Sequence, residues 1–301
     1  MKKIISSFVF LLFWATLHAQ TEVLINNGNA KIFYRTFGNG KPILIINGGP
    51  GMNSDGFAGL AKALSKNNQT IIYDQRGTGR STIENPDSTN ITMPLMADDI
   101  ETIRKHLAIG KWIILGHSFG GMMASYYATL HPESIEALIL SSSGGIDLDL
   151  LNSVSNGINS RLTPVEKDSV DYWTKKINDG DTTYYARLKR GTFLAPAYVF
   201  KRENIPVIAE RLTQSNGNIN GLVWQSMQAI NFDCAAKLAA FNKPVLILQG
   251  KQDVLDEKIA IKAHKVLKNS KLVFMDQCRH YGWLDRPDIY FDEVNKFISV
   301  K

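Results

Sequence analysis

A serine lies between glycines where a predicted strand passes into a predicted helix. The apolar residues 113–115 run into Gly116-His117-Ser118-Phe119-Gly120, a G-x-S-x-G spacing, and a helical pattern follows. Glycines at both flanks suit a sharp, strained turn, because side chains there would crowd the serine. In this strand-turn-helix context the spacing predicts a nucleophilic Ser118, with the backbone N–H of Phe119 directed at a developing oxyanion. The alternative is a glycine-rich turn that only packs a helix against a sheet.

Such a serine also requires a general base and a carboxylate that orients the base, because a neutral hydroxyl is a weak nucleophile. Asp253 lies on the loop after the predicted strand 245–248, and His280 lies on the loop after the predicted strand 272–275. The other histidines fall in the N-terminal segment, on predicted helices or their ends, or beside the serine. The acids just after Asp253 fit a helix N-terminus better. We therefore predict Asp253 and His280 as the partners of Ser118.

A second oxyanion donor is expected from the segment Asn47-Gly48-Gly49-Pro50-Gly51, which follows the predicted strand 43–46. Pro50 has no N–H, so Gly48 or Gly49 must donate, and we favour Gly49. A phosphate-binding loop is excluded because no Gly-Lys-Ser/Thr follows, and a dinucleotide fingerprint is absent as well. No spacing of zinc, calcium or iron ligands occurs, so the sequence predicts no cofactor and no metal.

The elements that position these residues alternate between apolar, β-rich runs and helical patterns. This alternation predicts a mostly parallel, eight-stranded sheet with helices on both faces. The first two strands flank an Asn-Asn-Gly-Asn turn and are expected to form an antiparallel hairpin. Strands are expected at 23–25, 31–37, 43–46, 70–73, 113–115, 137–140, 245–248 and 272–275. Helices are expected at 54–65, 93–107, 119–130, 257–267 and 287–298.

The alternation stops between residues 144 and 242, where polar, helical patterns replace the strand runs. This interval predicts a helical cap inserted into the core, which then consists of residues 20–143 and 243–301. Thr163-Pro164-Val165-Glu166 forms a capping box, so a helix is expected to start there and to run toward Asn178. The cap is expected to set substrate specificity.

The N-terminal segment predicts export. Lys2 and Lys3 precede an apolar stretch over residues 4–17, and Ala19 supplies a small residue for cleavage. This order predicts a signal peptide over residues 1–19 and a secreted or periplasmic protein. No later run has transmembrane length, so no stable membrane insertion is expected after cleavage. The sequence has only two cysteines, Cys234 and Cys278, and their number and spacing do not form a disulfide framework. We expect two buried thiols, and a single disulfide between them is the alternative.

Composition excludes several classes of protein. The chain has 301 residues, of which 44% are hydrophobic and 21% charged, so it is neither disordered nor fibrous. The net charge of +6 arises without any run of five like charges, which argues against a nucleic-acid partner. The expected partner is a small-molecule or short-peptide substrate, and the oligomeric state is left open.

Three motifs together carry a resemblance to a known family. Gly-Gly-Pro-Gly at 48–51, Asp-Gln-Arg-Gly-Thr-Gly-Arg-Ser at 74–81 and the serine motif occur in order before Asp253 and His280. In this combination the chain resembles the α/β-hydrolase superfamily and, within it, the proline iminopeptidase group. The resemblance implies an α/β-hydrolase fold with a cap and an aminopeptidase that acts through an acyl-enzyme. It also implies an architectural role for the 74–81 loop. The family commonly begins the oxyanion loop with histidine, where this chain has Asn47.

The family's aminopeptidases hold the ammonium of the substrate with glutamates of the cap. No cap position here matches that pattern, and the candidate substrate contacts are Glu203, Glu210 and Trp224. The leading hypothesis is an aminopeptidase that releases N-terminal residues from short peptides. A carboxylic ester or lactone hydrolase is the alternative, and a non-catalytic ligand-binding protein on the same fold is the third.

Overall fold

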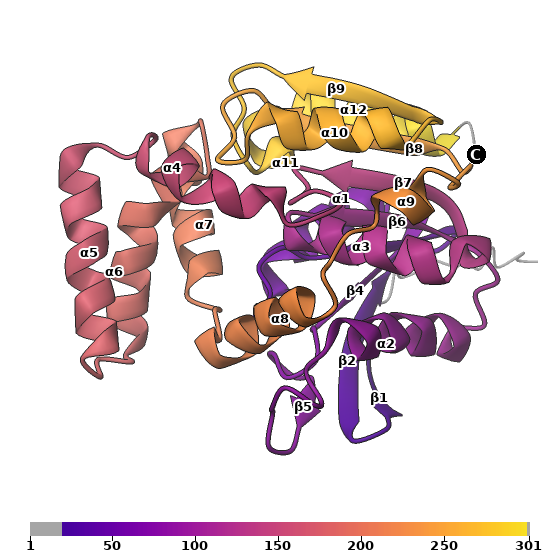
Figure 1. Ribbon diagram of the computed structural model, residues 1–301, viewed down its shortest axis with the longest axis horizontal. Coiled ribbons are helices and arrows are strands. Elements are labelled where there is room, and N and C mark those ends of the chain that lie inside the picture. The colour runs from indigo at the N-terminus through magenta and orange to yellow at the C-terminus, as the bar shows by residue number, and fades with distance from the viewer. Residues whose placement is uncertain (1–19, 300–301) are drawn as a thin grey trace, which may run out of the picture.

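A nine-stranded sheet runs through the molecule (Figure 1). The computed structural model describes residues 20–299, so the predicted signal peptide lies outside the described residues. The strands are β1 (Thr21–Asn27), β2 (Ala30–Phe37), β3 (Lys41–Ile46), β4 (Asn68–Tyr73), β5 (Thr82–Ile83), β6 (Trp112–His117), β7 (Ile135–Ser141), β8 (Val245–Gly250) and β9 (Ser270–Met275). Their order is β1-β2-β4-β3-β6-β7-β8-β9, with β5 beside β2.

The pairing pattern confirms a mostly parallel sheet. β2 runs antiparallel to β1, β4 and β5, and all the other pairings are parallel. The expected hairpin is present, and Gly28 in its turn has a φ of 58°, which glycine adopts without steric cost. The expected count of eight strands was one too low. The extra strand, β5, has only two residues, which is too short for an alternating pattern to show in the sequence.

Apolar side chains of the central strands pack on both faces of the sheet. In β3, Leu44 and Ile46 belong to one core cluster, and Ile43 and Ile45 belong to the other. Successive residues of a strand point to opposite faces, so a continuous apolar run indicates a strand buried on both sides. This explains why the runs in β3, β4, β6, β7 and β8 predicted strands correctly.

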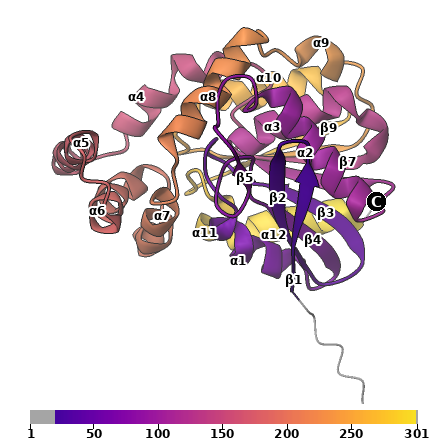
Figure 2. The same ribbon diagram turned by 90° about the horizontal axis from the view of Figure 1, so that it is seen from below.

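Helices cover each face of the sheet (Figure 2). On one face lie α2 (Met93–His106), α3 (Phe119–Leu130) and α10 (Glu257–Val266), and on the other lie α1 (Ala58–Leu64), α11 (Gly282–Asp285) and α12 (Pro287–Ser299). The helix expected over 54–65 is shorter in the structure, because the 3₁₀ turn η1 (Asp55–Phe57) precedes α1. The other short 3₁₀ turns are η2 (Pro132–Ser134), η3 (Asp149–Asn152), η4 (Ala195–Ala197) and η5 (Arg202–Asn204).

Between β7 and β8, the described chain forms six helices and no strand. They are α4 (Val154–Asn159), α5 (Pro164–Asn178), α6 (Tyr184–Leu194), α7 (Ile205–Leu212), α8 (Gly217–Ala229) and α9 (Ala235–Leu238). Figure 1 shows α5, α6 and α7 side by side at one end of the sheet. The predicted capping box is confirmed, because the backbone N–H of Thr163 donates to Glu166 and the backbone N–H of Glu166 donates to Thr163.

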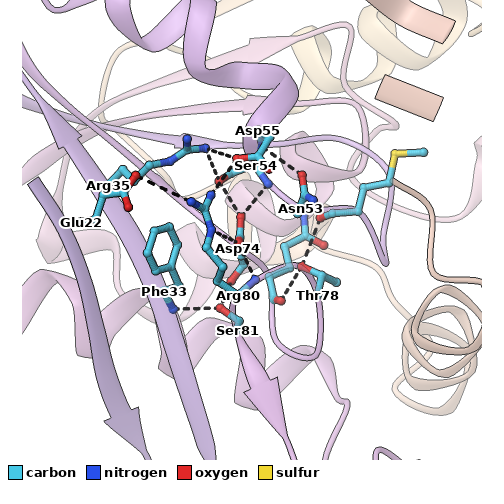
Figure 3. A network of polar contacts seen from close by, with 12 residues as sticks. Glu22, Phe33, Arg35, Asn53, Ser54, Asp55, Asp74, Thr78, Arg80 and Ser81 are labelled. Carbon is cyan, nitrogen blue, oxygen red and sulfur yellow. Dashed lines mark hydrogen bonds and ion pairs between the residues drawn. The ribbon is translucent and has the colours of Figure 1, made fainter. Parts of the chain in front are cut away.

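A polar network ties the loop after β4 to the segment after β3 (Figure 3). The buried carboxylate of Asp74 accepts hydrogen bonds from the Ser54 N–H at 2.8 Å and the Ser54 hydroxyl at 2.7 Å. It also accepts one from the Arg80 N–H at 2.9 Å. The Arg80 guanidinium then pairs with Asp55 at 2.7 Å and stacks 3.9 Å from the Phe33 ring centroid. These contacts support an architectural role for the loop 74–81.

The same loop holds a buried ion pair. Arg76 donates two hydrogen bonds to Asp99 of α2, at 2.9 and 2.7 Å, and both side chains are 1% exposed. Removing one partner leaves a buried, uncompensated charge, so Arg76→Met should lower the free energy of unfolding by about 3–5 kcal/mol. Denaturant unfolding measures this loss. Lys296→Met, which breaks an exposed pair with Asp292, serves as the control and should change stability by less than about 1 kcal/mol. Equal losses in the two variants would contradict the prediction.

Cys234 and Cys278 are free, buried thiols and form no disulfide, which confirms the expectation of two buried thiols. Burial raises the pKa of the Cys234 thiol to about 12 and also raises that of Cys278. Within the described part of the chain, no helix combines the length and the apolar character needed to cross a membrane.

Candidate active site

Ser118 occupies a strained turn between β6 and α3. Its φ of 56° and ψ of −122° lie outside the regions that side chains favour, and such strain gathers at functional sites. The glycines around it are packed too closely for a side chain. A Cβ at Gly116 would lie 2.3 Å from the Gly120 carbonyl oxygen, and one at Gly120 would lie 2.0 Å from that of Ile46.

The backbone of Ser118 is held by the end of β7. Its N–H donates to the carbonyl oxygens of Ser141 and Ser142, each at 3.1 Å. Its carbonyl oxygen accepts from the N–H groups of Gly121 and Gly144, each at 2.9 Å. A strained conformation persists only when its surroundings fix it, and these four hydrogen bonds do so. The serine hydroxyl itself has no hydrogen-bond partner within residues 20–299.

Asp253 and His280 form a buried pair. His280 Nδ1 lies 2.8 Å from Asp253 Oδ1, and the two residues are 4% and 1% exposed. Asp253 also accepts from Gln249 Nε2 at 2.9 Å and from the Leu255 N–H at 3.2 Å. Because a carboxylate only accepts, the pairing places the imidazole proton on Nδ1 and leaves Nε2 free to accept a proton. Sequence reasoning did not identify Gln249 as a donor to this carboxylate.

The carboxyl ends of three strands bring these residues to one edge of the sheet. Ser118 follows β6, Asp253 follows β8, and His280 follows β9. The His280 ring packs 4.6 Å from the ring of His117, the residue before Ser118, measured between centroids. The His280 N–H donates to the carbonyl oxygen of Tyr198 in the cap at 3.0 Å, which fixes the backbone of the histidine.

The loop after β3 lies against the serine. A Cβ at Gly48 would stand 2.7 Å from the Cβ of Ser118, and Gly49 has a φ of 70°, which favours glycine. Within residues 20–299, the N–H groups of Gly49 and Phe119 meet no hydrogen-bond acceptor. Phe119 is buried, and unpaired buried N–H groups are rare in folded proteins. Both N–H groups are therefore available to a ligand oxygen.

His117 forms an uncharged wall of the site. Its ring packs between those of Phe57, Tyr281 and Trp283, at centroid distances of 5.5, 5.0 and 4.8 Å. Burial, followed by the nearby charges of His280 and Arg211, holds the pKa of His117 well below its usual range. This histidine stays neutral at the pH of an ordinary assay.

Arg211, on helix α7 of the cap, contacts the loop after β3. Sequence reasoning did not identify this residue. Its guanidinium donates to the carbonyl oxygens of Gly48 at 2.8 Å and Asn53 at 2.7 Å, and to Gln214 Oε1 at 2.6 Å. The side chain is buried, and burial lowers its pKa. Nothing in the pattern of α7 distinguishes this arginine from a surface residue, because its contacts arise only from tertiary packing.

The three candidate substrate contacts of the cap lie on separate elements. Glu203 is exposed in η5, Glu210 is exposed on α7, and Trp224 is half-buried on α8 against the core. Of the three, Glu210 lines a cavity of about 790 Å³, whose wall includes Tyr281 and Trp283. The structure therefore does not bring these three residues together. Glu210 alone shares a cavity with Tyr281, the residue after His280, and that cavity is not lined by Ser118, Asp253 or His280.

Comparison with known proteins identifies a family and similar chains. A family model described as alpha/beta hydrolase fold matches residues 41–287. The proline iminopeptidase of Saccharolobus solfataricus is 26% identical over 301 residues, covering 92% of this chain and 94% of its own. The chain is thus similar to a proline iminopeptidase over nearly its whole length.

Solved structures share the fold at lower identity. An alpha/beta fold family hydrolase from Bacillus anthracis superposes with a TM-score of 0.75 and 20% identity, over 92% of this chain and 99% of its own. Est816, described as an N-acyl homoserine lactone degrading enzyme, superposes with a TM-score of 0.65 and 20% identity, over 91% of this chain and 100% of its own. The expected fold is therefore confirmed.

Proposed function

The chain belongs to the alpha/beta hydrolase fold family, and we propose that it is a serine hydrolase acting through an acyl-enzyme and, from its N-terminal segment, that it is secreted. One observation carries the proposal. A serine in a strained turn and a buried His280–Asp253 pair lie at the carboxyl ends of strands in one sheet. Nucleophile, orienting carboxylate and base follow one another in the chain order of this family.

The reaction begins when Ser118 Oγ attacks the substrate carbonyl carbon and His280 Nε2 takes the hydroxyl proton. Asp253 holds the imidazole in the required tautomer and stabilises the imidazolium that forms. The N–H groups of Gly49 and Phe119 donate to the oxyanion of the tetrahedral intermediate. His280 returns the proton to the leaving group, and the acyl-enzyme remains. Water then attacks the acyl carbon by the same steps in reverse, which releases the acid and restores Ser118.

We propose an aminopeptidase acting on short peptides with a small or proline first residue. The similarity to a proline iminopeptidase over 92% of the chain supports this substrate class. An aminopeptidase must also hold a free ammonium group, and Glu210 offers a carboxylate in the cavity that Tyr281 and Trp283 line. Tyr184 donates a hydrogen bond to this carboxylate, which holds its orientation.

The test compares prolyl and alanyl arylamides with their N-acetylated forms and with short acyl nitrophenyl esters. The protein should start at Gln20, because the proposal places cleavage after Ala19. The free-amine arylamides should be cleaved and the acetylated ones should not. Glu210→Gln should raise KM for the prolyl arylamide about ten- to a hundredfold, since it removes a charge-assisted contact, and should leave KM for the ester unchanged.

The matched control is Glu203→Gln, the same change at an exposed cap position outside this cavity. It should leave both KM values unchanged. Cleavage of the esters without cleavage of any free-amine arylamide would contradict the aminopeptidase proposal.

A carboxylic ester or lactone hydrolase is the second candidate, favoured by Asn47. This residue replaces the histidine common in the family, and its amide donates to the carbonyl oxygens of Gly48 at 3.1 Å and Met52 at 3.0 Å. The loop thus keeps its internal support without that histidine. A non-catalytic protein on this fold is the third candidate, and labelling of Ser118 by a fluorophosphonate would exclude it.

A further inference from the structure

Arg211 brings a buried positive charge from the cap to the loop that contains Gly48 and Gly49. We propose that Arg211 is a positioning residue, which orients and polarises the peptide group between Gly48 and Gly49 so that its N–H stabilises the oxyanion. This inference rests on the proposed serine hydrolase function, because it concerns the oxyanion hole of that reaction.

The argument begins with the peptide group itself. The carbonyl oxygen of Gly48 and the N–H of Gly49 belong to one planar unit, and the described peptide bonds are all trans. The two groups therefore point in opposite directions, and holding the oxygen fixes the direction of the N–H. Arg211 Nη2 donates to this oxygen at 2.8 Å, and Asn47 Nδ2 donates to it at 3.1 Å.

The guanidinium is itself firmly held. Nη1 donates to the carbonyl oxygen of Asn53 and to Gln214 Oε1, and the guanidinium carbon lies 5.2 Å from the centroid of the Phe57 ring. Gly56 provides the space for the arginine stem, because a Cβ there would lie 2.3 Å from Arg211 Cδ. The side chain is 2% exposed, so its position is set by packing and not by solvent.

The charge of Arg211 has no carboxylate partner within 4.0 Å among residues 20–299. Its neighbour Asp55 pairs instead with Arg35 and Arg80. A donor that pulls on a peptide oxygen strengthens the hydrogen bond donated by the N–H of the same group. Because Arg211 is buried, its field is also screened less than that of a surface cation. Both effects favour negative charge near the Gly49 N–H.

Two other contacts from the cap hold the loop without reaching this peptide. Asn220 Nδ2 donates to the carbonyl oxygen of Pro50 at 2.8 Å, and the Asn216 N–H donates to that of Gly51 at 2.8 Å. Asn220→Ala therefore weakens the attachment of the loop to the cap and leaves the Gly48–Gly49 peptide untouched. It is the matched control for Arg211.

The experiment measures hydrolysis of an acyl nitrophenyl ester and of the corresponding thionoester. Sulfur accepts weaker hydrogen bonds than oxygen, so the ratio of the two kcat values reports the strength of the oxyanion hole. Arg211→Gln should lower kcat for the ester about ten- to a hundredfold, less than the loss of an entire donor, with KM within about twofold. The ester-to-thionoester ratio should fall about fivefold or more, because the thionoester gains less from the hole.

Arg211→Lys keeps the buried stem and the charge but donates to fewer carbonyl groups, so its ratio should lie between those of wild type and Arg211→Gln. It supplies the same measurement if Arg211→Gln does not fold. Asn220→Ala should keep the wild-type ratio.

Two outcomes would overturn the inference. An unchanged ratio in both Arg211 variants would show that Arg211 only packs the cap onto the core. An equal fall in the ratio for Asn220→Ala would show that general attachment of the loop is responsible. A wild-type protein that neither hydrolyses these substrates nor reacts with a fluorophosphonate would instead refute the proposed function, and the inference with it.

Discussion

Ser118→Ala is expected to lower kcat by about four to six orders of magnitude, whichever substrate class the enzyme cleaves. Without the hydroxyl, no acyl-enzyme forms, and only binding and the oxyanion donors remain. The free energy of unfolding should stay nearly unchanged, because the hydroxyl makes no hydrogen bond within residues 20–299. The backbone hydrogen bonds that hold the turn remain in the variant.

Steady-state kinetics and denaturant unfolding of the purified variant test this result. The control is Ser125→Ala, the same change within α3 at a buried serine whose hydroxyl also has no partner among the described residues. It should retain wild-type kcat. If Ser118→Ala kept a rate within about tenfold of wild type, well above what a lost nucleophile allows, Ser118 would not be the nucleophile.

Asp253→Asn is expected to lower kcat by about four orders of magnitude with the fold intact. The carboxylate accepts from three donors, namely His280 Nδ1, Gln249 Nε2 and the Leu255 N–H. An amide has one accepting oxygen, so one orientation turns its NH₂ toward His280 and the other turns it toward Gln249. The first favours the wrong tautomer of His280, whose Nε2 then carries a proton and cannot act as the base.

The control is Asp256→Asn, three residues farther along the chain. Asp256 is exposed and caps α10 by accepting from the Lys258 N–H at 2.9 Å. Asparagine also caps helices well, so this variant should keep wild-type kcat. A near wild-type rate in Asp253→Asn would show that Asp253 does not orient the base.

The sequence predicted those elements best whose cues are local. The helix expected from Thr163 to Asn178 is α5, because a capping box starts it and an Asn-Asp-Gly turn ends it. The predicted bounds of α3 are also correct, since the glycine turn before it and the apolar pattern within it are both short-range features. The strand β5 escaped prediction because its two residues gain their structure only by pairing with β2.

For the candidate site, the sequence predicted residues that the structure places at the ends of strands, and their roles stay predictions. Ser118, Asp253 and His280 each follow an apolar run, and parallel strands bring such positions to one edge. It did not locate Arg211 or Gln249, because neither stands out by type or spacing in its own element. Their roles follow from how the cap and the last strands pack around the loops. For the same reason, the cap residues that contact substrate could be named only as candidates.

The cap leaves the core after β7 and returns at β8, two strands that are direct neighbours in the sheet. An insert at this point can be exchanged by recombination without altering the register of any strand, which makes the cap a natural module for acquiring new specificities. The bond from Arg211 to Gly48 adds a condition to such an exchange. On the role proposed for Arg211, a chimera that receives a foreign cap gains a new pocket but loses a support of the Gly48–Gly49 peptide, so a fast grafted enzyme must supply its own cation to that carbonyl.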